Sequence, residues 1–336
     1  MKSARPWQLL AGVAIAAAGL WFFLRDVDAA ELARHARAIR PLSVAAGMAL
    51  CILSLWLRSL RWRVMLPAAP AGGDKKGLFG ATMIGFMVNN ILPARVGEAV
   101  RVLILWKRNR YAPAAAVGSL LLERGIDALA FGSLFYVPVF ILGLERLRGP
   151  AVMVMAVSAA VIAGMTFYAF VPAAARAMFT ALTCLLPGTI RHKAQALLDQ
   201  ALSNLDWIFS PARTSAVILL SFGTVLCWPL IIYLLVDAGG PFTLLHAMVA
   251  QSFAIVGVLI PLSPGYVGSL HAVLWQGLVI LGVDKEAARA ITIVYHAVSY
   301  IPITIIGLVY FMGTNISFRE ISRAGDDIRT KPGLPG

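Results

Sequence analysis

Long apolar stretches, separated by short polar segments, make up most of this chain. A helix that crosses a membrane needs about 20 mostly apolar residues, and the pattern indicates about six such spans. They are predicted at 7–24, 42–57, 112–144, 150–171, 214–237 and 290–312. The first span shares the basic start of a signal peptide. Its apolar run is longer than usual and further spans follow it, so we interpret it as a retained helix.

The segments between the spans are more polar. Residues 25–40 are charged and predict a surface helix. Residues 173–213 predict an amphipathic segment that lies along the membrane interface. The second span is followed by residues typical of a basic and aromatic interface belt, namely Arg58, Arg61, Trp62 and Arg63.

Two apolar stretches are too short or too interrupted to be ordinary spans. Residues 78–92 end at Pro-Ala-Arg-Val-Gly, and residues 242–282 are interrupted by Pro-Leu-Ser-Pro-Gly-Tyr-Val-Gly. Proline and glycine end helices, and non-helical backbone at membrane depth survives only where protein or a wet cavity satisfies it. We therefore expect two re-entrant hairpins in an all-α integral membrane protein. The predicted breaks are Pro93, Gly97, Pro264, Gly265 and Gly268.

The two halves of the chain resemble each other. The two Pro-x-x-Val-Gly segments are 171 residues apart, and the spans that precede them start 172 apart. This spacing predicts inverted repeats at about 42–144 and 214–312, within a single membrane domain of residues 1–315. A polar tail, 316–336, follows. Paired Pro/Gly-broken segments in inverted halves are the best sequence indication of a transporter-type central site.

Composition and charge agree with this interpretation. Of the 336 residues, 60% are hydrophobic and 13% are charged, whereas soluble domains average about 45–50% and about 25%. Soluble enzymes, secreted disulfide scaffolds and disordered chains are therefore excluded. If both hairpins return to their starting side, 18 of the 29 Lys and Arg residues share the side of the N-terminus and 8 lie opposite. This bias predicts cytoplasmic termini and accounts for the net charge of +13 without a nucleic-acid partner.

Six charged residues lie at or near membrane depth: Arg95, Glu98, Arg101, Glu123, Arg124 and Asp127. Each would cost about 2.5–3.5 kcal/mol at a helix centre, and their signs cancel, so we expect them to be paired or to face water. The i, i+3 spacing places Glu98 with Arg101, and Arg124 with Asp127, on shared helix faces.

Two interpretations of these charges remain open. They either hold the first hairpin against the following helix through ion pairs, or form a polar site for the charged headgroup of a lipid. In the second case Arg95 and Arg124 bind the anion, because the planar guanidinium group of arginine can donate two hydrogen bonds to phosphate oxygens. The three carboxylates then orient the arginines or take protons.

Uncharged polar residues complete the candidate site. Asn89 and Asn90 precede the first break and can satisfy its freed backbone groups. His271 and His296 are either hydrogen-bonded core residues or a pH-sensitive pair, since histidine titrates near neutrality. The candidate substrate-binding residues are Arg95, Glu98, Arg101, Glu123, Arg124, Asp127, Asn89, Asn90, Ser263, His271, His296 and Tyr300. No zinc-ligand spacing or nucleotide motif is present, so neither a metal nor a cofactor is expected.

Three blocks resemble a known family. They are the segment from Asn89 to Arg101, the segment Glu123-Arg-Gly-Ile-Asp127, and the segment from Pro261 to Gly268. They are similar to signature blocks of the flippase-like family that forms the transmembrane region of lysylphosphatidylglycerol synthases, also called UPF0104. The resemblance covers roughly residues 7–315. It implies a bacterial inner-membrane protein that moves or binds lipids, in some members beside a lipid-modifying enzyme or glycosyltransferase.

The chain departs from the family pattern in three places. Full synthases carry a soluble aminoacyl-transfer domain, and here about 24 residues follow the last span, so synthase activity is not expected. The family often has Glu shortly after the second hairpin's Gly and Arg after the Tyr of the last span. His271 and His296 stand at these places, so two histidines replace an acid–base pair.

These observations support a lipid flippase or lipid transporter that binds anionic or phosphate-bearing headgroups in a central polar cavity. One alternative is a membrane-embedded transferase on a lipid-linked substrate, with Glu123 and Asp127 as general bases. The other is an accessory subunit of a lipid or glycan biosynthesis complex.

Overall fold

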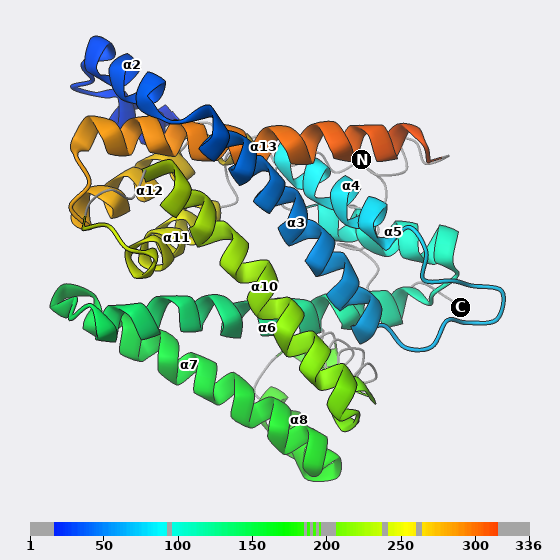
Figure 1. Cartoon of the computed structure of the whole chain (residues 1–336). Helices are drawn as coiled ribbons and strands as arrows, with labels where there is room; N and C mark the ends of the chain where they lie inside the picture. Colours follow the sequence, from blue (N-terminus) through cyan, green and yellow to red (C-terminus); the bar gives the residue numbers. More distant parts are fainter. Residues whose placement is uncertain are drawn as a thin grey trace.

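The regular structure of the protein is helical throughout the part that the computed structural model describes (Figure 1). That part comprises residues 17–92, 96–184, 187–188, 191–192, 195, 206–236, 241–259 and 264–314. Its helices are α2 (Ala29–Ala38), α3 (Pro41–Met65), α4 (Leu78–Ile91), α5 (Gly97–Asn109), α6 (Pro113–Ile141), α7 (Glu145–Phe170), α8 (Pro172–Thr183), α10 (Pro211–Val236), α11 (Leu244–Leu259), α12 (Ser269–Ile280) and α13 (Lys285–Met312), with short 3-10 turns η2 (Asp206–Phe209) and η3 (Pro264–Tyr266).

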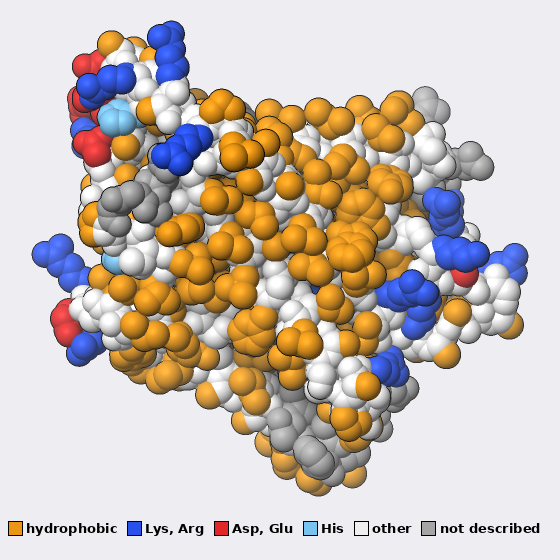
Figure 2. All heavy atoms as spheres, viewed as in Figure 1, with side chains coloured by type: hydrophobic (Ala, Val, Ile, Leu, Met, Phe, Trp, Pro, Cys, Tyr) orange, Lys and Arg blue, Asp and Glu red, His pale blue; other side chains and the backbone are white. Residues whose placement is uncertain are grey.

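Within the described residues, five helices are long and apolar enough to cross a membrane: α3, α6, α7, α10 and α13. They lie at five of the six predicted spans, and most of the sixth, 7–24, lies outside the described residues. Apolar side chains cover the middle of the molecule in Figure 2, while charged side chains gather towards its two ends. A soluble surface would not have such a belt. The predicted class, an all-α membrane protein, is confirmed.

The centre of the bundle is the contact between α3 and α10, which run side by side across the molecule (Figure 1). Ser54 Oγ on α3 donates a hydrogen bond to the Thr224 carbonyl on α10, at 3.0 Å. At Gly47 an added Cβ would lie 3.1 Å from the Val298 side chain of α13, so the glycine lets these helices approach closely. The largest apolar core forms where α3, α10, α11, α12 and α13 meet.

Two pairs of short helices accompany the long ones. α4 packs on α5, and α11 packs on α12. Glycines permit both contacts, because a Cβ at Gly97 would lie 1.9 Å from the Gly85 carbonyl oxygen and one at Gly257 would lie 2.8 Å from Leu270 Cα. The order long, short, short, long therefore occurs twice, in α3–α6 and in α10–α13.

The polar segment before α3 forms the predicted surface helix. α2 contains no buried residue, and its N-terminus is capped by the Asp28 side chain, which accepts from the N–H groups of Ala30 and Glu31. The predicted amphipathic segment, 173–213, is described only in parts, which include most of α8, η2 and the start of α10.

The prediction of an interface belt after residue 57 is wrong for three of its four residues. α3 does not end near Leu57 but continues for two further turns to Met65. Arg58, Arg61 and Trp62 are thereby carried into the interior, where all three are buried. Arg63 alone among the four belt residues is exposed.

Candidate functional site

The candidate site is built on one face of α6. Glu123 and Asp127 are four residues apart, so both carboxylates point to the same side of the helix. Both are buried, and both accept hydrogen bonds from the same guanidinium nitrogen, Arg58 Nη1, at 2.7 and 2.6 Å. The predicted carboxylate pair is therefore present, and an arginine of α3 joins its two members.

Two further buried arginines bind the same carboxylates. Arg61 Nη2 lies 2.6 Å from Asp127 Oδ1, and Arg61 Nη1 donates to Ser221 Oγ of α10 at 3.1 Å. Arg101 of α5 forms two parallel hydrogen bonds to the oxygens of Glu123, at 3.0 and 2.8 Å. Its guanidinium lies 4.1 Å from the ring centroid of Trp62, a distance typical of a cation–π contact. Three helices, α3, α5 and α6, thus meet at two carboxylates, and α10 joins them through Ser221 and Arg61.

Arg124 completes the set and differs from the other arginines. Its Nη2 lies 3.2 Å from Glu123 Oε1, and its Nη1 lies 3.8 Å from Asp127 Oδ2. Its side chain is 39% exposed, whereas those of Arg58, Arg61 and Arg101 are at most 5% exposed. Arg124 is therefore the arginine that a ligand arriving from outside the bundle can reach.

We call these six residues the arginine cluster: Arg58, Arg61, Arg101, Glu123, Arg124 and Asp127. Four guanidinium groups face two carboxylates, so the cluster carries two excess positive charges when every group is ionised. The Nε atom of each of the four arginines is buried and finds no hydrogen-bond partner in the described part of the chain. Buried cations are costly in a membrane interior, so this excess calls for an anion.

The structure corrects the expected pairing in the first hairpin. Arg101 binds Glu123 rather than Glu98 among the described contacts. Glu98 instead accepts from Asn89 Nδ2 at 3.3 Å. The same Asn89 accepts, through Oδ1, from the backbone N–H of Gly97 at 2.7 Å. Asn89 therefore satisfies the backbone at the start of α5, as its position before the break predicts.

The ends of the two short-helix pairs approach each other at α13. Asn90, near the end of α4, donates through Nδ2 to Thr304 Oγ1 at 3.1 Å, and its carbonyl accepts from the Tyr300 hydroxyl at 3.4 Å. Gly265 in η3 is so close that an added Cβ would lie 3.1 Å from the Tyr300 ring and 3.5 Å from the Asn90 carbonyl. Its φ of 63° also favours glycine. Tyr300 thus contacts the end of α4 and lies beside Gly265 of η3.

The two candidate histidines are in contact. His296 Nδ1 lies 3.4 Å from His271 Nε2, and their ring centroids are 4.8 Å apart. The other nitrogen of His271, Nδ1, accepts from the backbone N–H of Gly268 at 3.4 Å, where φ is 87°. The next ring along α13 is Tyr300, 5.4 Å from His296. The two positions that depart from the expected acid–base pattern are therefore neighbours in space.

α6 and α13 differ chemically at positions with the same offset. α6 and α13 start 172 residues apart, and at that offset Glu123, Arg124 and Asp127 correspond to Tyr295, His296 and Ser299. The three charged residues of α6 therefore have no Asp, Glu, Lys or Arg at the same offset in α13. Pro93, Arg95 and Ser263, together with the tail from residue 315, lie outside the described residues.

Arg58 and Arg61 are the site residues that sequence analysis missed. A signal for them exists in α3, where buried positions recur at helical spacing through Cys51, Ser54, Leu55, Arg58, Arg61, Trp62 and Met65. This spacing continues the buried face past the point where the hydropathy falls. Adding Arg58 and Arg61 to the six charged residues predicted at membrane depth changes the net charge of that set from zero to +2.

The fold and the cluster define a multi-pass helical membrane protein with a charged interior. Residues 9–307 match the family described as the lysylphosphatidylglycerol synthase TM region. The chain belongs to this family, which confirms the resemblance seen in its sequence blocks.

Two relatives illustrate the range of named proteins to which the chain is similar. A UPF0104 membrane protein of Methanothermobacter thermautotrophicus is 23% identical over 309 residues, which cover 85% of this chain and 90% of that protein. A protein named glycosyltransferase AglD, from Haloferax volcanii, is 28% identical over 126 residues, which cover 38% of this chain and 20% of that protein.

Proposed function

We propose that this protein is a lipid flippase or lipid transporter that binds an anionic, phosphate-bearing headgroup at the arginine cluster. The observation that carries the proposal is the charge imbalance of the cluster, four arginines against two carboxylates. A phosphodiester supplies negative charge and oxygen acceptors in the geometry that guanidinium groups bind best.

The cluster suits binding because most of it is already held in place. Arg58, Arg61 and Arg101 are fixed by Glu123 and Asp127, so little side-chain entropy is lost when an anion arrives. Arg124 is only loosely held and partly exposed. It is the group that contacts the headgroup first. The positive charges of the buried arginines then attract the headgroup electrostatically.

The arrangement of the hairpins supports transport over static binding. We propose that α4–α5 and α11–α12 are re-entrant hairpins in inverted halves of one membrane domain, with their breaks meeting at Tyr300. Broken helices at the interface of inverted halves form the binding sites of secondary transporters. In this proposal the His271–His296 pair forms the second-half wall of the same pathway.

Transferase chemistry is less well supported at this site. A general base needs a free lone pair within reach of its substrate, and both carboxylates already accept from two or more arginines. A role beside a lipid-modifying enzyme or glycosyltransferase is favoured by one observation, the similarity of 126 residues to a protein named a glycosyltransferase. We place the protein in the bacterial inner membrane with both termini cytoplasmic, the orientation that the Lys and Arg distribution favours.

Transbilayer movement of fluorescent lipids in proteoliposomes tests the proposal. Wild-type protein is compared with Arg124→Gln across phosphatidylglycerol, phosphatidic acid and phosphatidylcholine analogues. The matched control is Arg148→Gln, which removes an exposed arginine paired with Glu145. We expect Arg124→Gln to slow movement of the anionic lipids about tenfold or more and the control to leave it unchanged. Equal rates for both variants, or no movement above that of protein-free vesicles, would refute the proposal.

A further inference from the structure

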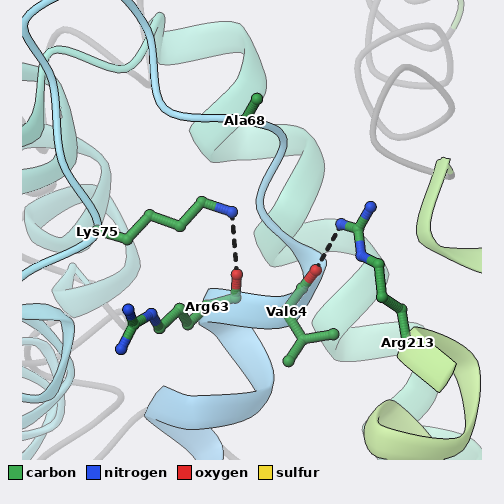
Figure 3. A pocket seen from close by; sticks show the side chains of 5 residues that line it. All are labelled: Arg63, Val64, Ala68, Lys75 and Arg213. Atoms are coloured by element: carbon green, nitrogen blue, oxygen red, sulfur yellow. Dashed lines mark hydrogen bonds between the residues drawn. The ribbon is translucent and has the colours of Figure 1, made fainter.

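A second cationic site lies at the end of α3, apart from the arginine cluster. Here a cavity of about 410 Å³ is lined by Arg63, Val64, Ala68, Lys75 and Arg213 (Figure 3). Its volume is within the range of pockets that hold small ligands. Three of these lining residues are cations, and none of the lining residues in the described part of the chain is acidic.

Two of the cations reach the end of α3 from opposite sides (Figure 3). Lys75 Nζ donates to the carbonyls of Leu66 and Arg63, at 2.8 and 3.2 Å. Arg213, in the first turn of α10, donates through Nη2 to the Val64 carbonyl at 2.7 Å. These bonds fix both side chains in place and satisfy carbonyls that a helix end leaves free.

Capping the helix does not account for the full charge of this site. A helix C-terminus carries about half a negative charge, whereas three cations gather around it. Their mutual repulsion is visible in Lys75, whose pKa is lowered by burial and then by the charges of Arg213 and Arg63. The nearest acid in the sequence, Asp74, is engaged elsewhere, by the side chain of Asn109 and the backbone N–H of Lys76. The site therefore keeps a positive excess that an anion would neutralise.

The surroundings indicate where such an anion comes from. Phe209, just before α10, and Leu219, about 9 Å further along that helix than Arg213, are 65% and 72% exposed. Apolar side chains this exposed on a membrane-crossing helix face lipid chains. Lipid chains therefore reach this end of α10, and a phospholipid held there can place its phosphate beside Lys75 and Arg213.

This site is separate from the arginine cluster. Arg213 and Ser221, the α10 residue that contacts Arg61, are eight residues apart, which is about 12 Å along the helix. Buried apolar residues of α3, α6, η2 and α10 pack together at this end of the bundle, namely Met65, Leu122, Trp207 and Val217.

We propose that the cavity formed by Arg63, Lys75 and Arg213 binds the phosphate group of an anionic phospholipid at the membrane surface. Lys75 and Arg213 donate to the phosphate oxygens with the N–H groups not used on α3, and Arg63 adds charge at the rim. The site holds a lipid in place at the end of α3 and does not depend on transport by the protein.

Native mass spectrometry of the full-length protein in detergent tests this site, with phosphatidylglycerol and phosphatidylcholine as probes. The test variant is Lys75→Gln/Arg213→Gln, in which the amides can still donate to the α3 carbonyls. The control variant, Lys76→Gln/Arg37→Gln, removes two exposed cations that do not line the cavity. We expect the test variant to bind the phosphatidylglycerol molecule of this site about 30-fold more weakly, since each basic residue near a lipid surface contributes about a factor of five, while a molecule bound at the arginine cluster stays in place. The control variant should bind it as wild type does.

Three further binding measurements make the outcome of this experiment decisive. The charge-preserving variant Lys75→Arg/Arg213→Lys should retain binding, which separates lost charge from lost folding. An excess of inorganic phosphate that displaces the lipid would show that the cavity recognises phosphate alone, and failure to displace it would show that the acyl chains are also needed. The pocket substitutions should weaken binding equally in an Arg124→Gln background, because the two sites are separate. Unchanged phosphatidylglycerol binding in the test variant, or equal wild-type affinity for phosphatidylcholine, would overturn the proposal.

Discussion

Arg61 on α3 and Asp127 on α6 form an ion pair inside the helix bundle, with Nη2 and Oδ1 2.6 Å apart and the arginine side chain fully buried. The two residues are 66 positions apart in the chain. Their contact, together with that of Arg58, joins α3 to α6, the helix that follows the short pair α4 and α5. The cluster is therefore a structural joint as well as a candidate binding site.

Neutralising Asp127 should destabilise the protein strongly. Asp127→Asn leaves the buried Arg61 without a counter-charge and leaves Arg58 with Glu123 alone, and breaking a buried pair in this way costs about 3–5 kcal/mol. Thermal unfolding of the purified protein in detergent would report the loss. Glu145→Gln serves as control, because its exposed pair with Arg148 is worth at most about 1 kcal/mol. Similar melting temperatures for the two variants would show that the cluster does not hold the helices together.

The crossing of α4 and α5 should depend on Gly97. An added Cβ would lie 1.9 Å from the Gly85 carbonyl oxygen, so Gly97→Ala should force the short helices apart. The yield of monodisperse protein in size-exclusion chromatography should fall severely. Gly125→Ala on α6 is the matched control, because nothing lies within 4 Å of its added Cβ. Normal behaviour of Gly97→Ala would contradict the close crossing.

The contact between His271 and His296 predicts that their substitutions are coupled. His296→Arg alone should place a charged group beside a mostly buried histidine and lower the melting temperature. Adding His271→Glu should restore much of that loss, because the new carboxylate would lie within reach of the new guanidinium, with a coupling of about 3 kcal/mol. A double-mutant cycle by thermal unfolding measures this coupling. Additive effects would mean that the two side chains do not interact.

Asp284 should make a small, pH-dependent contribution to stability. Its carboxylate accepts from the backbone N–H groups of Ala287 and Glu286 at the start of α13, and the Ala287 bond is the main cause that lowers its pKa below the usual 3.8. Because the folded-state pKa is depressed, this stabilisation is present above about pH 4 and is lost as the pH falls through the folded-state pKa.

Comparing Asp284→Asn with the wild type at several pH values isolates this effect. The asparagine keeps a cap but cannot ionise, so the gap between the two melting curves should close as the pH falls below 4. The side chain is largely exposed, so the gap should stay under about 1 kcal/mol. A gap that widens in acid would contradict the assigned direction.

The positions of the long helices could be predicted from the sequence because membrane burial leaves a strong apolar signal. The surface helix α2 and the cap that Asn89 provides for α5 were also predictable, since both rest on local spacing. The residue at which α3 ends could not be predicted from the sequence. Hydropathy falls at Arg58, and a basic run after an apolar span is usually an interface belt.

The composition of the arginine cluster could be predicted only in part, for a physical reason. Glu123, Arg124 and Asp127 share one helix, so their common face follows from helical geometry. The partners of the two carboxylates, Arg58 and Arg101, lie 65 and 22 residues away, and no local rule assigns such pairs. Spacing predicted a Glu98–Arg101 pair, but packing of α5 against α6 directs Arg101 to Glu123.

Photolabelling tests the central claim most directly, namely that the positive excess of the arginine cluster receives an anionic headgroup. A phosphatidylglycerol analogue with a diazirine next to its phosphate would be reconstituted with the protein, activated, and located by peptide mass spectrometry. We predict labelled peptides from α6 around Arg124 in the wild type, and loss of this label in Arg124→Gln but not in Arg148→Gln. Equal labelling of α6 by a phosphatidylcholine analogue, or unchanged labelling in Arg124→Gln, would contradict the claim.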